Sequence, residues 1–396
     1  MPKLNPFQAL QAKPEYISQV TANSANFDSD SEIAAELKKN PLSFLHVTRN
    51  HLLRSENVQS LSTLFENSKE YFSQLIEKEI VKPTEGDIFY VYRQTHDDVS
   101  HTGIIGLCDI VDYQRNRIRK HEHTRPSTEM FVANLMETVN MIGEPLLLSH
   151  HHKQSLEDLL RWVIQTEPNI SFEKKGKGHQ IWVINDPDII RAIQTEVGAM
   201  EDFYIMDGHH RAASVSNLYH ESEDESKRYC MAYLLDSSQL KISSFHRLVK
   251  VDSMNDVVLF EQLRSHFWVE EVPDYAVHPE HKGEFILKCS SGSYRLQLKE
   301  AREQLDVREL ENHVLSNIFQ ISDSRLDDRI SFISTQDELT DAIIESQLPN
   351  TYLFLLHPCT FEDIALISDN DEFMPPKSTF VEPKCDSGLF IQPYGE

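Results

Sequence analysis

The fold of this chain is decided by one stretch, Phe203-Tyr-Ile-Met-Asp-Gly-His-His-Arg-Ala-Ala-Ser-Val215. Its first four residues predict a short buried strand, the Asp-Gly pair a turn, and the remainder a helix with apolar positions at Ala212 and Val215. A strand that turns through glycine into a helix leaves the first backbone N–H groups of the helix without intrahelical acceptors. The helix dipole adds partial positive charge there. The stretch therefore predicts an anion-binding site.

Two side chains of this stretch have chemistry that suits such a site. The guanidinium of Arg211 can hold two phosphate oxygens at once, and a charged carboxylate at Asp207 can orient a metal ion or a hydroxyl group. The residues alone leave a second interpretation open, in which a helix cap precedes histidines with ordinary hydrogen-bond partners.

The segment from Asp207 to Ala213 resembles the phosphate-binding box of the ParB/sulfiredoxin-like superfamily, in the variant carried by the free-serine kinases. The second box of those kinases is a His-Glu pair before a helix, which is followed by proline and a short strand. This chain has Lys120-His-Glu-His-Thr124, a helical run to Ile142, and then Gly143-Glu-Pro-Leu-Leu-Leu148. Both boxes occur in the order found in the kinases.

The resemblance implies a role for each residue of the two boxes. Glu122 would be the general base that takes the proton of an attacking hydroxyl, and the alternative for it is a solvated loop carboxylate. The implied catalytic residues are Glu122, Asp207 and His210. The implied nucleotide-binding residues are His121, Gly208, His209 and Arg211. The implied ligands are ATP or ADP with Mg²⁺, together with a small hydroxyl compound such as L-serine, and no protein ligand to a metal ion is assigned.

The whole chain also resembles the family known as domain of unknown function 1015. The segments that carry this resemblance are residues 40–49, 90–94, 120–124 and 374–379, with Pro383-Lys384 and Ser387-Gly388. One departure concerns the helix after the His-Glu box. The wider family often has an acidic residue and an arginine where this chain has Phe131-Val132.

Length and patterning predict an α+β protein in two parts. The 396 residues suffice for two or three domains. We expect a ParB/sulfiredoxin-like catalytic half at 1–250, with an insertion at about 150–200, and a mixed α+β domain at 251–396. Apolar runs predict a strand over 43–47 and one continuous strand over 240–249. Residues 374–383 show no regular pattern.

The amino-acid composition limits the classes of partner that the protein is expected to have. The net charge of −25 disfavours a DNA-binding role, which requires clustered lysine and arginine, but it leaves room for a local cationic pocket. No apolar run approaches a membrane span, and residues 1–6 lack the apolar core of a signal peptide, so we expect a cytoplasmic protein without a membrane partner. The five cysteines predict neither a disulfide framework nor a zinc ribbon. The sequence leaves open whether the protein forms a homo-oligomer.

Three hypotheses of function follow. The first is a nucleotide-dependent small-molecule kinase. The second is a nucleotide-binding regulatory or sensor protein without transfer activity, which the insertion and the Phe131-Val132 departure would suit. The third is a metal-dependent hydrolase built on His121, His209 and His210. The consecutive histidines 150–152 favour a solvated turn over a metal site, because neighbours at a strand end point in different directions.

Overall fold

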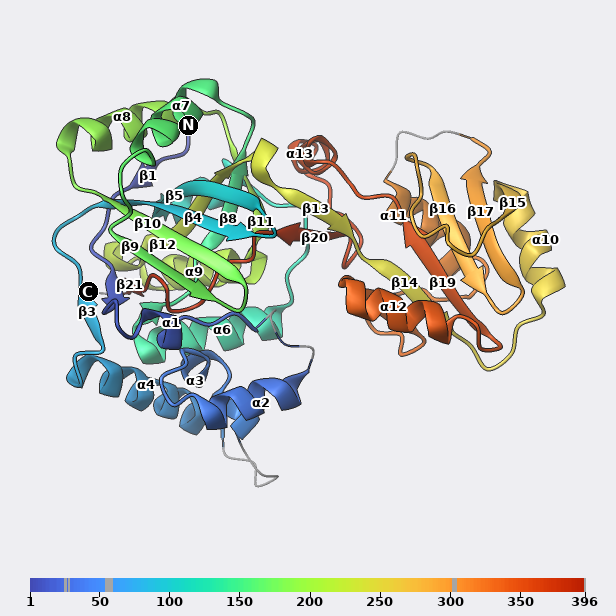
Figure 1. Cartoon of the computed structure of the whole chain (residues 1–396), viewed down its shortest axis with the longest axis horizontal. Helices are drawn as coiled ribbons and strands as arrows, with labels where there is room; N and C mark the ends of the chain where they lie inside the picture. The colour runs from blue at the N-terminus through green and yellow to red at the C-terminus, as the bar shows by residue number, and fades with distance from the viewer. Residues whose placement is uncertain (25–26, 28, 54–59, 301–304, 395–396) are drawn as a thin grey trace. The chain divides into compact units, whose positions relative to one another are not determined.

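The computed structural model describes residues 1–24, 27, 29–53, 60–300 and 305–394 (Figure 1). The chain is an α+β protein, as the sequence predicts. It divides into two compact units. The first comprises Met1–Lys120, Thr124–Leu240 and Pro383–Glu396, and the second comprises His121–His123 and Lys241–Glu382.

Within the described residues, the first unit is built on a nine-stranded sheet. Its strands follow the order β6 (Ile118–Arg119), β11 (Phe203–Asp207), β8 (Leu146–His150), β12 (Tyr229–Asp236), β5 (Val99–Asp109), β4 (Phe89–His96), β10 (Lys177–Ile184) and β9 (Ile170–Lys174), with β1 (Leu4–Asn5) also paired to β5. The pairs β11–β6 and β12–β8 are parallel, and the other pairs are antiparallel.

One face of this sheet packs against helices. Alternate residues of a strand point to the same face, so Ala232 and Leu234 of β12 enter one buried cluster. Helices α7 (Gln154–Val163), α8 (Pro187–Gly198) and α9 (His209–Ser222) add Leu160, Ile193 and Val215 to it. Each such side chain contributes about 1.5–3 kcal/mol when fully buried. The start of α9 is therefore held by the core of the sheet.

The opposite face carries aromatic side chains and the end of the chain. Tyr92 of β4 lies 5.3 Å from Tyr233 of β12 between ring centroids. Phe390 packs on the same surface, with its ring centroid 4.9 Å from Tyr90 and 6.0 Å from Tyr92. Burial of these rings docks the C-terminal residues onto the first unit.

The expected insertion at about 150–200 extends the sheet. It contains α7, the hairpin of β9 and β10, and α8, and β10 pairs antiparallel with β4. A further helical layer consists of α2 (Asp30–Lys39), α3 (Leu45–Thr48) and α4 (Leu61–Glu77) (Figure 1). Of these helices, α4 packs against α6 (Pro126–Val139). In that packing the ring of Phe65 meets Phe131 at 5.2 Å.

The second unit is built on a six-stranded antiparallel sheet within the described residues. The strand order is β15 (Phe267–Val272), β17 (Gly292–Leu298), β16 (Glu284–Cys289), β19 (Thr351–Leu356), β14 (His246–Lys250) and β18 (Ile330–Ile333). Its helices are α10 (Asp256–His266), α11 (Asp306–Leu310) with the π-helical turn Glu311–Ser316, α12 (Gln336–Glu345) and α13 (Phe361–Asp369).

Short elements complete the chain. They are β2 (Leu10–Ala12), α1 (Ile17–Val20), η2 (Asn50–Leu53), β3 (Val81–Pro83), α5 (Ile110–Gln114), β7 (Met141–Ile142), η3 (Glu225–Lys227), η4 (Ser237–Gln239), β13 (Lys241–Ser244), β20 (Thr379–Glu382) and β21 (Gln392–Pro393).

Three predictions of local structure are wrong. The strand over 43–47 is the helix α3, because an apolar run this short does not distinguish a strand from a buried helical turn. The strand over 240–249 is interrupted at Phe245, where the chain leaves its pairing with β20 and joins the six-stranded sheet. The segment 374–383 contains β20, whose partner β13 is distant in sequence.

The expected halves, 1–250 and 251–396, stay a prediction. Strand pairing determines the compact units: β14 joins the six-stranded sheet of the second unit, while β21 pairs with β7 in the first.

Candidate functional site

The predicted strand–turn–helix is confirmed. Strand β11 ends at Asp207, Gly208 adopts φ +98° and ψ 24°, and α9 begins at His209. A Cβ atom at Gly208 would lie 2.9 Å from both Arg211 Nη2 and Leu146 Cδ2. Only glycine fits both this backbone conformation and this contact.

Arg211 acts as a clamp at the start of α9. Its Nη1 lies 3.0 Å from Oε1 of Glu144, and its Nη2 donates to Oδ2 of Asp207 and to the carbonyl oxygen of Pro145, each at 3.0 Å. Burial lowers the pKa of Arg211, but Glu144 and Asp207 outweigh it and raise the pKa above its ordinary value. The Nε donor is buried without an acceptor among the described residues.

Asp207 is held by a second cation. Nζ of Lys384 donates to Oδ1 of Asp207 at 2.6 Å, so each oxygen of this carboxylate accepts from a different cation. Burial favours the neutral acid, yet Lys384 and Arg211 lower the pKa of Asp207 to about 2. Asp207 is therefore ionised at neutral pH.

Glu144 stands on the loop before β8 and completes the cluster. Its Oε1 meets Arg211, and its Oε2 accepts from Oγ of Ser387 at 3.2 Å. Burial raises the pKa of Glu144, and Arg211 opposes that rise. Asp207, Glu144, Arg211 and Lys384 together form what we call the box cluster, which has two acidic and two basic members.

The two histidines of the box lie in the first turn of α9. His209 is 6% exposed. The pKa of His210 is lowered, mainly by burial, so its imidazole is neutral at pH 7. The carbonyl oxygen of His210 accepts from Oγ of Ser214 at 2.7 Å, which closes this turn of the helix.

The His-Glu box lies in the other compact unit. There the carbonyl oxygen of His121 accepts from the backbone N–H of Met374 at 2.8 Å, and the ring of His123 stacks on Phe373 at 3.8 Å. His121 is 3% exposed, and burial lowers its pKa to about 4. Glu122 is exposed. The predicted pairing of Glu122 with the start of α9 stays a prediction.

The box cluster does not fit a metal ion held by the protein. Magnesium needs free carboxylate oxygens, but those of Asp207 and Glu144 already accept from cations or from Ser387. Among the described residues there is no group of three His, Cys, Asp or Glu side chains placed to hold a metal ion.

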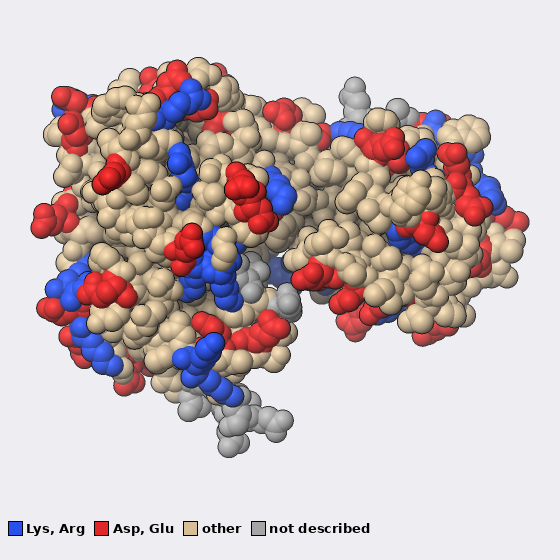
Figure 2. Space-filling model, viewed as in Figure 1, with Lys and Arg blue, Asp and Glu red and all other residues tan. Residues whose placement is uncertain are grey.

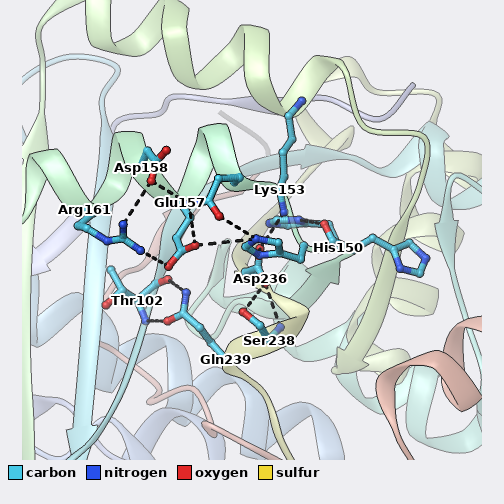
Figure 3. Close-up of polar contacts among 12 residues, drawn as sticks. Thr102, His150, Lys153, Glu157, Asp158, Arg161, Asp236, Ser238 and Gln239 are labelled. Carbon is cyan, nitrogen blue, oxygen red and sulfur yellow. Dashed lines mark hydrogen bonds and ion pairs between the residues drawn. The ribbon is translucent and has the colours of Figure 1, made fainter.

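His150, labelled in Figure 3, and His152 belong to a separate polar cluster in the first unit, whereas the side chain of His151 contacts Tyr204. Nδ1 of His152 lies 3.1 Å from Oδ2 of Asp236, and the same oxygen accepts from the backbone N–H of Lys153 at 3.1 Å. Oδ1 of Asp236 accepts from the backbone N–H and hydroxyl of Ser238, at 2.9 and 2.7 Å. These contacts hold the ends of β8 and β12 together, and this structural role accounts for the cluster.

Sequence reasoning assigned no role to Glu144, Lys384 or Ser387. All three lie within segments that carry the family resemblance, and that was the only sequence signal available for them. Their placement needed tertiary structure, since 177 residues separate Asp207 from Lys384 and 243 separate Glu144 from Ser387.

On the face drawn in Figure 2, lysine and arginine side chains are interspersed with acidic ones and form no broad basic patch. Among the described helices, none has both the length and the apolar character needed to cross a bilayer.

The chain belongs to the family described as a protein of unknown function, DUF1015, whose model matches residues 4–314. The expected family is thus confirmed, and no curated protein matches the sequence. Similar solved structures include a mutant free serine kinase in complex with ADP, at 16% identity, 72% coverage of this chain, 92% of that chain and a TM-score of 0.40. SbnI from Staphylococcus aureus, with a C-terminal truncation, matches at 12% identity and a TM-score of 0.41, and the match covers 70% of this chain and 82% of that chain. A conserved hypothetical protein from Pyrococcus furiosus matches at 14% identity and a TM-score of 0.38, and the match covers 72% of this chain and 95% of that chain.

Proposed function

We propose that this protein binds a nucleotide at the start of α9 and transfers its terminal phosphoryl group to a small hydroxyl compound, with L-serine the first candidate. The observation that carries the proposal is the turn at Gly208, which ends β11 and begins a helix of 14 residues. The first N–H groups of such a helix have no intrahelical acceptors, and its dipole favours an anion there.

The surroundings of the turn support an anionic ligand. The box cluster supplies two cations for its two carboxylates, so its acidic members need not repel a phosphate. A bound phosphate chain would thus meet backbone donors beside a neutralised carboxylate pair.

The base in this proposal is Glu122, an assignment that rests on the resemblance of residues 120–124 to the His-Glu box. Glu122 accepts the hydroxyl proton, the hydroxyl oxygen forms a bond to the terminal phosphorus, and the bond between that phosphorus and its bridging oxygen breaks. With ATP the leaving group is ADP, and with ADP it is AMP. Positioning and charge neutralisation supply most of the rate in reactions of this class.

Phosphorus NMR tests the proposal. Purified protein with Mg²⁺ is given ATP, or separately ADP, and a panel of free amino acids. The Glu122→Gln and Glu362→Gln proteins are assayed beside it; Glu362 is an exposed acidic residue of α13 and serves as the matched control. We expect a phosphoserine signal that the first substitution removes and the second preserves. Unchanged turnover in Glu122→Gln contradicts the base assignment.

A nucleotide-binding sensor without transfer activity is the second candidate. The side chain of Phe131 packs on Phe65, and Val132 packs on the core of the first unit. Apolar residues thus occupy the positions where the wider family often has a charge pair. Nucleotide binding without a phosphoester product from any acceptor would favour this candidate over the kinase.

A further inference from the structure

The C-terminal segment 383–388 is firmly fixed on the first unit. The side-chain amide of Asn23 donates to the carbonyl oxygens of Lys384 and Cys385, at 3.4 and 3.3 Å, and to Oδ1 of Asp386 at 2.9 Å. Ser387 exchanges two backbone hydrogen bonds with Ala22, at 2.7 and 2.9 Å. The segment therefore delivers the Lys384 side chain from a defined backbone position.

Lys384 reaches the turn on which the proposed function rests. Its ammonium lies 2.6 Å from the carboxylate of Asp207, the residue directly before Gly208. The side chain of Lys384 is 22% exposed, so part of it is open to solvent. A cation from the end of the chain thus stands beside the first residues of α9.

Lysine suits a ligand-contacting role here better than Arg211 does. The two terminal nitrogens of Arg211 already contact Glu144, Asp207 and Pro145. The planar guanidinium cannot rotate without breaking those contacts. An ammonium has three donors on a flexible stem. It can keep its bond to Asp207 and also donate to a phosphate oxygen.

We propose that Lys384 is a phosphate-binding residue of the candidate site, which contacts the terminal phosphate of a nucleoside diphosphate held at the start of α9. This inference rests on the proposed nucleotide binding, but not on phosphoryl transfer. The competing explanation is that Lys384 only neutralises Asp207 and never touches the ligand.

The test is calorimetric titration of the full chain with ADP and with adenosine. Loss of a charge-assisted contact to phosphate should weaken ADP binding about ten- to a hundredfold in Lys384→Met, with little change for adenosine. Lys384→Arg, which retains the charge, should lose less. The matched control is Lys82→Met, because Lys82 is an ion-paired lysine of the same unit, 2.9 Å from Glu79 and outside the box cluster.

The double variant Asp207→Asn/Lys384→Met separates the two explanations. It removes both members of the Lys384–Asp207 ion pair, whereas in Lys384→Met the Asp207 carboxylate keeps Arg211 as its cationic partner. If Lys384 contacts phosphate, the double variant binds ADP more weakly than Asp207→Asn alone. If Lys384 only neutralises Asp207, the double variant and Asp207→Asn bind ADP equally and the inference is wrong.

The remaining outcomes distinguish the inference from the proposed function. Wild-type binding of ADP that Lys384→Met leaves within twofold overturns the role of Lys384 and spares nucleotide binding. Wild-type binding of ADP without any phosphoester product overturns the kinase proposal and leaves the role of Lys384 to the titrations. Absence of ADP binding by the wild-type protein overturns both.

Discussion

The guanidinium of Arg211 lies 3.0 Å from the carboxylate of Glu144 and ties the start of α9 to the loop before β8. Strand β8 is the neighbour of β11 in the sheet, so the ion pair fixes the helix start against two adjacent strands. The side chains of Arg211 and Glu144 are 18% and 30% exposed, which protects the pair from much of the screening by water.

This relationship predicts strong energetic coupling between Arg211 and Glu144. A double-mutant cycle with Arg211→Met and Glu144→Gln, measured by denaturant unfolding, should give a coupling free energy of about 1–3 kcal/mol. The control pair is Arg161 with Glu157 on α7, at 2.6 Å but more exposed, for which we expect about 0.5 kcal/mol or less. Equal coupling free energies in the two pairs would contradict the role of Arg211 as a clamp. Arg211→Ala should also weaken ADP binding.

Gly208 should tolerate no side chain. Gly208→Ala combines a positive φ with contacts at 2.9 Å to Arg211 and Leu146, so it should destabilise the protein by more than about 2 kcal/mol. The control is Gly176→Ala, where φ is also positive, at +74°, but no atom lies within 4 Å of the added Cβ; its cost should be about 1 kcal/mol. Thermal unfolding of both variants measures the difference. Equal costs would mean that the close contact at Gly208 relaxes freely.

His121 should make stability depend on pH. Its pKa is lowered by burial from 6.5 to about 4, so between these values the unfolded chain binds more protons than the folded one. Stability is complete above pH 6.5 and falls as the pH drops towards 4, by about 3 kcal/mol for this group. Denaturant unfolding of His121→Gln at pH 7, 6, 5 and 4 should show a flatter profile than the wild type. His246, whose burial also lowers its pKa to about 4, supplies a second variant with the same sign. A profile identical to wild type in both variants would contradict the assignment.

Asp236 should control the protonation of His152. The pKa of His152 is raised, first by the charge of Asp236 and then by Gln154, so the ion pair stabilises the fold at low pH and is lost as the pH rises through the folded-state pKa of His152. In Asp236→Asn the pKa of His152 should fall, as followed by NMR titration of the imidazole. Ser238→Ala removes one donor to Asp236 but keeps its charge, so its effect should be smaller. A His152 pKa that does not respond to Asp236→Asn would show that another group raises it.

Elements with a strong local pattern could be predicted from the sequence. The order of strand, Asp-Gly turn and helix at 203–222 was predictable because apolar runs, a glycine and helical periodicity are properties of neighbouring residues. Helix α3 was not predictable, since the same apolar run satisfies a strand or a helical turn. The break at Phe245 was missed for a related reason: β13 and β14 take partners in different sheets.

The sequence by itself determined the α+β class, the family, and a helix start suited to an anion at Gly208. Tertiary structure alone decided that Arg211 is bound by Glu144 and Asp207, and that Lys384 supplies the other cation at Asp207. It also decided that His121–His123 belong to a different compact unit from the box at Asp207. The physical reason is the range of the interactions. Backbone geometry and periodicity act over a few residues, whereas an ion pair across 177 residues exists only after the chain has folded.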